Sequence, residues 1–201
     1  SLSARLRPAY FDPARIPMPF TELCGRLDGL VYTCDANVAS LLPTVLASIE
    51  NNFGPGIAHI AFRREADGGL RIEFSEGAQV HRVRIVENGY AESRITQRQD
   101  TYIVRANCQS ERISDTEWAL HLNVHLIETP CTRLMHFLFR GDAVTLLCDE
   151  FPSVQDASEM LLMLSGLTRQ QVVRTLLPLL KRDQLQSRLK TFTTTTVQGR
   201  L

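Results

Sequence analysis

The chain has 201 residues, and its 22 basic and 22 acidic side chains give a formal net charge of zero. Hydrophobic residues make up 44% and charged residues 22%, which is typical of a globular domain and excludes a disordered or fibrous chain. No apolar stretch approaches the roughly 20 residues of a membrane-spanning helix, and the first residues show no signal-peptide pattern. We therefore expect a cytoplasmic protein without a membrane partner.

Residues 1–27 are predicted to be a proline-rich lead-in, and residues 1–20 to be extended, because prolines disfavour a helix there. The prolines stand at positions 8, 13, 17 and 19. Residues 28–34 combine a turn with a short apolar run and predict the first strand. Residues 38–51 place apolar side chains at helical spacing, and Pro43 fits only the first turn of such a helix.

From residue 57 the hydrophobic period changes to two, which is the period of half-buried strands. Glycine-rich turns separate the runs, and residues 91–100 are predicted to be a polar loop. The predicted strands are 57–62, 70–74, 80–85, 102–105, 118–127, 132–139 and 143–147. We expect an antiparallel sandwich or open barrel over residues 28–150.

The clearest hairpin joins residues 118–127 to 132–139. If Ile127 pairs with Thr132, the leucines and phenylalanines of both strands share a core face. The opposite face then carries His121, Asn123 and His125, with His136 across the ladder.

We interpret Asn123, His125 and His136 as the candidate polar lining of a ligand cavity. His121 and His125 are four residues apart on one strand, about 13 Å, which is too far for both to bind one metal ion. We therefore predict no metal and no cofactor. Cys131 follows Glu128 at the hairpin tip, but no base stands within reach of it, so we predict no catalytic residue.

The five cysteines are odd in number and widely spaced, and they include no C-x-x-C pair. This pattern favours reduced, mostly buried thiols over a zinc site or a disulfide framework. A single bridge between Cys24 and Cys34 is the alternative.

After Pro152 the sequence predicts a helical hairpin over residues 151–192, followed by a polar tail over 193–201. The run of threonines over 193–196 is interpreted as a frayed end or an edge strand. Ser153 can cap the first helix, and Thr168 with Gln171 forms a capping box for the second. Seven basic side chains and one acidic side chain give residues 166–201 a net charge of +6, against −6 for residues 1–165. Such a basic segment either packs on the protein's own acidic face or binds an acidic partner.

Two segments carry family resemblances. Glu128-Thr129-Pro130 followed by residues 136–142 resembles the C-terminal accessory β-domain of β-lactamase-like serine hydrolases, with 28–149 as the matching range. That resemblance implies an accessory domain and transfers no catalytic residue. Residues 157–182 resemble the helix-turn-helix of winged-helix regulators. The resemblance implies that Arg169, Gln170 and Arg174 would contact base edges and phosphates of DNA.

The sequence thus predicts an α+β protein in which an antiparallel sheet precedes a helical hairpin. Its expected function is that of a non-catalytic accessory or binding domain for a small apolar ligand or a partner protein. A DNA-binding regulator is the first alternative, and an enzyme that uses the histidine-bearing sheet face is the second.

Overall fold

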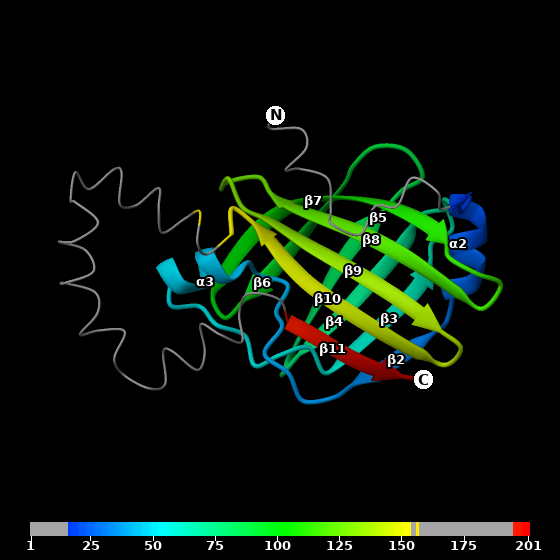
Figure 1. The fold of residues 1–201 in the computed structure, drawn as a ribbon. Coiled ribbons are helices and arrows are strands. Elements are labelled where there is room, and N and C mark those ends of the chain that lie inside the picture. The colour runs from blue at the N-terminus through cyan, green and yellow to red at the C-terminus, as the bar shows by residue number, and fades with distance from the viewer. Residues whose placement is uncertain (1–15, 154–155, 157–194) are drawn as a thin grey trace.

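The computed structural model describes residues 16–153, 156 and 195–201. Within these residues, eleven strands form one sheet that curls into a half-barrel, and two short helices pack against it (Figure 1). The curled antiparallel sheet predicted from the alternating segments is confirmed.

The described part of the chain contains the following strands and helices, given in chain order. The strands are β1 (Ile16–Pro17), β2 (Val31–Cys34), β3 (His59–Arg64), β4 (Leu70–Glu76), β5 (Gln79–Ile85), β6 (Ala91–Gln97), β7 (Asp100–Arg112), β8 (Glu117–Leu126), β9 (Thr132–Arg140), β10 (Ala143–Phe151) and β11 (Thr195–Arg200). The helices are α2 (Phe20–Leu27) and α3 (Thr44–Ile49). Figure 1 shows α2 and α3 at opposite ends of the sheet.

The strand order is β1-β7-β8-β9-β10-β11-β2-β3-β4-β5, and β6 pairs with the first half of β7. The curl brings β5 beside β6, where the backbone N–H of Arg84 donates to Ser93 Oγ at 2.9 Å. The C-terminal strand β11 lies between β10 and β2. It therefore connects the N-terminal strand β2 to the rest of the sheet through backbone hydrogen bonds.

The concave face of the sheet holds an aromatic core. Phe62 lies 6.0 Å from Phe137 and 6.1 Å from Phe139 between ring centroids, and Tyr32 lies 5.9 Å from Phe139. Trp118 stacks on Phe139 at 3.8 Å. Since these side chains come from β2, β3, β8 and β9, their burial holds the two halves of the sheet together.

The loop between β2 and β3 closes one end of the sheet through buried carboxylates. Glu76 accepts a hydrogen bond from the backbone N–H of Leu41 at 2.7 Å and another from Ser40 Oγ at 2.8 Å. Glu150 accepts from the backbone N–H of Thr44, at the start of α3, and from Arg133. The loop is thus anchored to β4 and β10 through its own backbone.

Glycine is required at one position of this loop. Gly56 has a φ of +102°, and a Cβ there would stand 2.2 Å from the carbonyl oxygen of Asn37. Asn37 in turn binds the backbone of Ile57 through both atoms of its amide group. The loop therefore returns to β3 along a path that only glycine permits.

The predicted helix over 38–51 is wrong in its bounds, because only α3 is helical. Pro43 lacks a backbone N–H and stands directly before the helix, and Ser40 and Leu41 bind Glu76 instead of forming a helical turn. The end of the lead-in predicted over residues 1–27 forms the helix α2, which buries Leu23, Cys24 and Leu27.

The predicted polar loop over 91–100 is also wrong, because β6 occupies most of it. Ile95 and Gln97 are buried on its inner face while polar side chains point outward. The signal was missed because polar β-branched residues such as Thr96 fit an exposed strand face as well as they fit a loop.

The hairpin of β8 and β9 has the predicted faces and a different register. His125 pairs with Thr132 and Glu117 with Arg140, two residues away from the predicted alignment. The turn is displaced by one residue toward the N-terminus, since the backbone N–H of Leu126 donates to the Cys131 carbonyl at 3.0 Å. A shift of two residues leaves each side chain on its own face but changes its partner.

The structure describes only part of the region after residue 151, so it bears on only some of the predictions for that region. Within the polar tail predicted over 193–201, Thr195–Arg200 forms the strand β11, which lies between β10 and β2 and not at an edge of the sheet. Most of the predicted hairpin over 151–192, including Arg169, Gln170 and Arg174, lies outside the described residues. The winged-helix resemblance is wrong: the part of the chain that the structure describes is mainly sheet, and its two short helices, α2 and α3, are both remote in sequence from 157–182. Neither helix in that part is long and apolar enough to cross a bilayer.

The aromatic core yields the first prediction. Phe137 is 1% exposed, so Phe137→Ala removes a fully buried ring and leaves a cavity. We expect the free energy of unfolding to fall by about 3–5 kcal/mol in urea denaturation. Val80→Ala, at a position that is 44% exposed, is the control and should change it by no more than about 0.5 kcal/mol. Similar losses for the two variants would contradict this account of the core.

Candidate functional site

Two histidines face each other on the convex side of the sheet, and we call them the histidine pair. His121 on β8 pairs directly with His136 on β9, and their Nδ1 atoms are 2.7 Å apart. Glu111 on β7 places Oε1 3.1 Å from His121 Nε2. The strand register thus joins three polar side chains into one hydrogen-bonded row.

The row admits one arrangement of protons when both imidazoles are neutral and the carboxyl group is ionised. An ionised carboxylate only accepts, so His121 Nε2 carries a hydrogen and donates to Glu111. Neutral His121 then has an unprotonated Nδ1, which accepts from the Nδ1–H of His136. His136 consequently keeps its Nε2 as an acceptor.

All three side chains are largely buried, with exposed fractions of 5% for Glu111, 8% for His121 and 7% for His136. Burial, and after it the interaction with His121, lowers the pKa of His136 to about 4, and Asp149 partly opposes the shift. The pair therefore resists a second positive charge.

A pocket of about 340 Å³ lies beside β1, and we call it the glutamate pocket. Its wall combines apolar side chains with polar ones from β7 and β8. The lining residues are Pro17, Met18, Phe20, Glu87, Cys108, Gln109, Ser110, Glu111 and His121. Ser110 donates from Oγ to the Met18 carbonyl at 3.0 Å, which holds the rim to β7.

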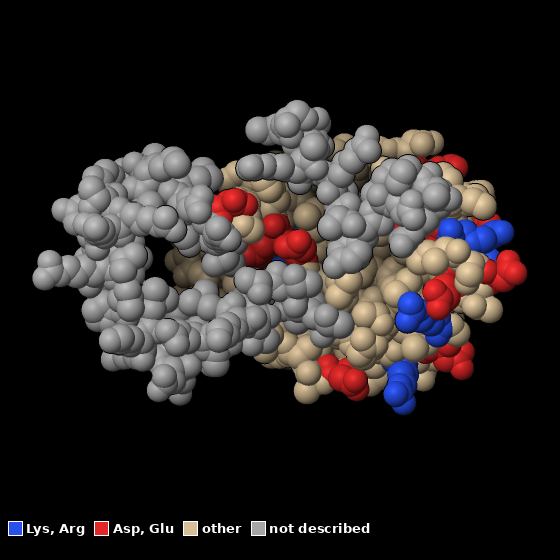
Figure 2. Space-filling model, viewed as in Figure 1, with Lys and Arg blue, Asp and Glu red and all other residues tan. Residues whose placement is uncertain are grey.

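A smaller pocket of about 190 Å³ lies on the other side of His121, and we call it the His136 pocket. It is lined by Ile113, Glu117, Ala119, His121, His136, Phe137, Leu138, Arg140 and Leu147. Arg140 Nε and Glu117 form an ion pair at 3.0 Å. Figure 2 shows basic and acidic side chains interspersed near the α2 end of the described surface.

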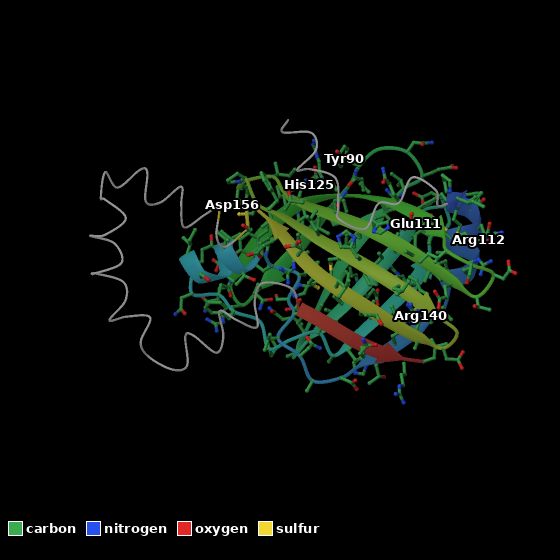
Figure 3. All side chains as sticks on the ribbon, in the orientation of Figure 1. Tyr90, Glu111, Arg112, His125, Arg140 and Asp156 are labelled. Carbon is green, nitrogen blue, oxygen red and sulfur yellow. The ribbon has the colours of Figure 1, made fainter. Side chains whose placement is uncertain are left out.

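The structure separates the three predicted ligand-binding residues. His136 lies in the histidine pair, whereas His125 donates to or accepts from Thr132 Oγ1 and packs against Tyr90. Asn123 pairs with Asn107 on β7. In Figure 3, His125 and Tyr90 lie together near one end of the strands, and Glu111 lies toward the other.

Sequence reasoning missed the roles of His121 and Glu111. The predicted register placed His136 opposite Asn123, which removed the direct contact between His121 and His136. Glu111 belongs to a long strand that was predicted to end at residue 105. An alignment of the polar residues of β7 with those of β8 would have placed Glu111 on the same sheet face as His121.

The cysteines are all free, so the alternative bridge between Cys24 and Cys34 does not form. Burial raises the pKa of Cys108, in the glutamate pocket, to about 12, and that of Cys34 to about 11. Such thiols carry almost no thiolate near neutral pH and are poor nucleophiles. Burial also raises the pKa of Cys131 at the hairpin tip. In the described ranges, no three His, Cys, Asp or Glu side chains are placed to hold a metal ion.

Comparison with protein-family models, with curated proteins and with solved structures found no match for this chain. The resemblance of residues 28–149 to the accessory domain of serine hydrolases is therefore wrong, as is that of 157–182 to winged-helix regulators. Both rested on short strings, such as Glu128-Thr129-Pro130, that any hairpin tip accommodates.

The histidine pair predicts a loss of stability in acid. The folded pKa of His136, about 4, lies below the ordinary value of 6.5, so the unfolded chain binds more protons between these values. The free energy of unfolding therefore decreases as the pH falls from about 6.5 to about 4, by an amount of order 1–3 kcal/mol from this group. Urea denaturation at each pH measures it.

His136→Asn removes this titrating group, so its stability should depend less steeply on pH over the same range. His59→Asn, at an exposed position on β3, is the matched control and should keep the wild-type slope. A slope that His136→Asn leaves unchanged would contradict the assigned environment of this side chain.

Proposed function

We propose that the chain is a non-catalytic binding domain for a small, mostly apolar molecule that carries a hydrogen-bonding group, and that the ligand occupies the glutamate pocket. The observation that carries this proposal is the pocket itself. It has a volume of about 340 Å³ and lies against the buried Glu111 and His121. Ligand sites typically combine such an apolar wall with a few fixed polar groups.

The position of the polar groups supports binding. Glu111 is held by its hydrogen bond with His121, and His121 is held by His136, so both side chains have little rotational freedom. Phe20 and Met18 supply apolar contact surface on the opposite wall. A ligand therefore meets a prearranged polar edge and loses little free energy in ordering the protein.

The same geometry disfavours catalysis. Both ring nitrogens of His121 are engaged, one with Glu111 and one with His136, so His121 has no nitrogen left to accept a proton from a substrate. The pocket thiol, Cys108, has a strongly raised pKa and cannot serve as a ready nucleophile. We therefore favour binding over the histidine-based enzyme.

Benzyl alcohol is a suitable probe, since it combines an apolar ring with one hydroxyl group. We expect it to bind wild-type protein with a Kd of about 1 mM or lower, measured by isothermal titration calorimetry. Gln109→Trp adds a large side chain to an exposed pocket-lining position and should abolish binding by filling the site.

Gln198→Trp is the matched control, because Gln198 is an exposed position on β11 that lines neither pocket. It should bind benzyl alcohol as the wild type does. Equal binding by Gln109→Trp and Gln198→Trp would place the ligand elsewhere and overturn the proposal.

A further inference from the structure

We propose that the ligand of the glutamate pocket contains one extended amino acid residue flanked by two amide groups, and that this residue pairs with the backbone of Cys108 as a neighbouring strand would. The inference rests on the proposed function, because it concerns the same pocket, and it names the class of ligand. The observation that carries it is a gap in the backbone pairing of β7 at this pocket.

The edge of β7 that faces away from β8 is covered by two different strands. β6 pairs with residues 100–106 of β7, and β1 pairs with residues 111–112. Met18, directly after β1, extends the second pairing, since its backbone N–H donates to the Ser110 carbonyl at 2.9 Å. Among the described residues, no strand covers residues 107–109 on this edge.

The direction of the backbone groups in this gap follows from the neighbouring hydrogen bonds. Successive residues of a strand point their N–H and C=O groups to alternate sides. The Ser110 carbonyl faces β1, whereas the Ile103 carbonyl faces β8, where it accepts from the backbone N–H of Ile127 at 3.0 Å. The register of β7 with β8 is continuous over residues 104–112, so the alternation is unbroken there. Both backbone groups of Cys108 therefore point into the gap.

The gap opens into the glutamate pocket, which lies at the sheet edge and is lined from both faces. The lining includes Cys108, Gln109 and Ser110 from the gap, and Met18 and Phe20 from the chain after β1. An uncovered strand edge offers an N–H donor and a C=O acceptor to an extended peptide. A ligand in this pocket therefore lies beside the uncovered edge at Cys108.

The length of the gap limits the ligand to one paired residue. Ala106 and Ser110 are four residues apart, which is about 13 Å along the strand. An extended residue with its two flanking amides spans about 7 Å, so it fits between the end of β6 and Met18. In an antiparallel pair, each residue donates one hydrogen bond and accepts another. The ligand residue thus needs an N–H and a C=O group on either side of one α-carbon.

The concave side of the pocket wall selects an apolar side chain. Paired residues place their side chains on the same face of a sheet, so the ligand's side chain lies beside that of Cys108. This is the concave face, because Val104 and Ala106 of the same alternation are buried in the core. Met18 belongs to that core, and Phe20 packs against it. A leucine side chain matches such a wall.

The charge of the wall favours an amide over a carboxylate at the end of the ligand. Glu87 lines the pocket from the loop between β5 and β6 and is exposed. No Lys or Arg stands among the described residues that line the pocket. A terminal carboxylate would be repelled by Glu87, whereas an amide would not. The ligand is therefore a segment of peptide rather than a free N-acyl amino acid.

The first test removes the hydrogen-bond donor from the ligand. We expect N-acetyl-L-leucine N′-methylamide to bind the wild-type protein with a Kd of about 1 mM or lower in isothermal titration calorimetry. The analogue that is methylated on the leucine nitrogen keeps the side chain but lacks the N–H, and it should bind about tenfold more weakly or worse. Equal binding of the two compounds would overturn the proposal.

A second pair of compounds tests the end of the ligand. N-acetyl-L-leucine keeps the donor and the side chain but ends in a carboxylate. It should bind more weakly than N-acetyl-L-leucine N′-methylamide, by about threefold or more. Tighter binding of the carboxylate would overturn the assignment of an amide at that end and point to a free N-acyl amino acid.

Hydrogen exchange locates the pairing on the protein. Saturating N-acetyl-L-leucine N′-methylamide should slow exchange of the Cys108 amide hydrogen, because the ligand carbonyl then accepts it. The Gln109 amide is the internal control, since it faces β8 and is already paired opposite His121. Its exchange should slow by a smaller factor. Equal slowing at both amides, or none at Cys108, would contradict strand-like pairing at this edge.

Variants place the compound in the pocket. Gln109→Trp should lose binding of N-acetyl-L-leucine N′-methylamide, because the indole fills the site. Gln198→Trp, which lines neither pocket, should bind it as the wild type does. Equal binding by the two variants would put the compound elsewhere and overturn the proposal.

This inference and the proposed function fail in different ways. Binding of benzyl alcohol without binding of N-acetyl-L-leucine N′-methylamide overturns the inference and leaves the proposed function standing. Failure of both compounds to bind overturns the proposed function and the inference with it.

Discussion

The direct pairing of His121 with His136 is the contact on which the convex face depends. It exists because β8 and β9 pair in one register, in which the two histidines stand opposite each other, and because β7 brings Glu111 beside them. Each histidine satisfies the other's Nδ1, so two imidazoles and a carboxylate are buried with their hydrogen bonds made. Both pockets take their shape and their polarity from this row.

The concave face is stabilised by apolar packing and not by hydrogen bonds between side chains. It is built from apolar and aromatic side chains that need only volume and burial, and Phe62, Phe137 and Phe139 fill it from separate strands. Polar groups enter it at one end, where Glu76 and Glu150 hold the loop that carries α3. One sheet thus has an inert face, a polar face with two pockets, and a closed end.

For β8 and β9, the sequence correctly predicts which side chains share a face of the sheet. It does not predict which residues pair across the two strands. Alternation along residues 118–139 assigned Leu120 and His121 to opposite faces, and this survives any shift by an even number of residues. Prediction of the contact between His121 and His136 required the position of the turn at the hairpin tip, which the hydrophobic period does not determine. The strand β11 was beyond reach because it pairs with β2 and β10, which are distant from it in sequence, whereas Glu111 was missed because its strand was predicted to end at residue 105.

The anchoring of the loop between β2 and β3 has a consequence for how this protein tolerates change. Glu76 and Glu150 accept hydrogen bonds from the backbone N–H groups of Leu41 and Thr44. Every amino acid except proline supplies such a group. Substitutions other than proline at these two positions therefore keep the N–H donor of the anchor, although Leu41 is fully buried and a change of its size would cost packing. The acceptors of the anchor lie on β4 and β10, so a change of Glu76 or Glu150 would release the loop, whereas burial of Leu41 and the positive φ of Gly56 constrain the loop's own sequence separately.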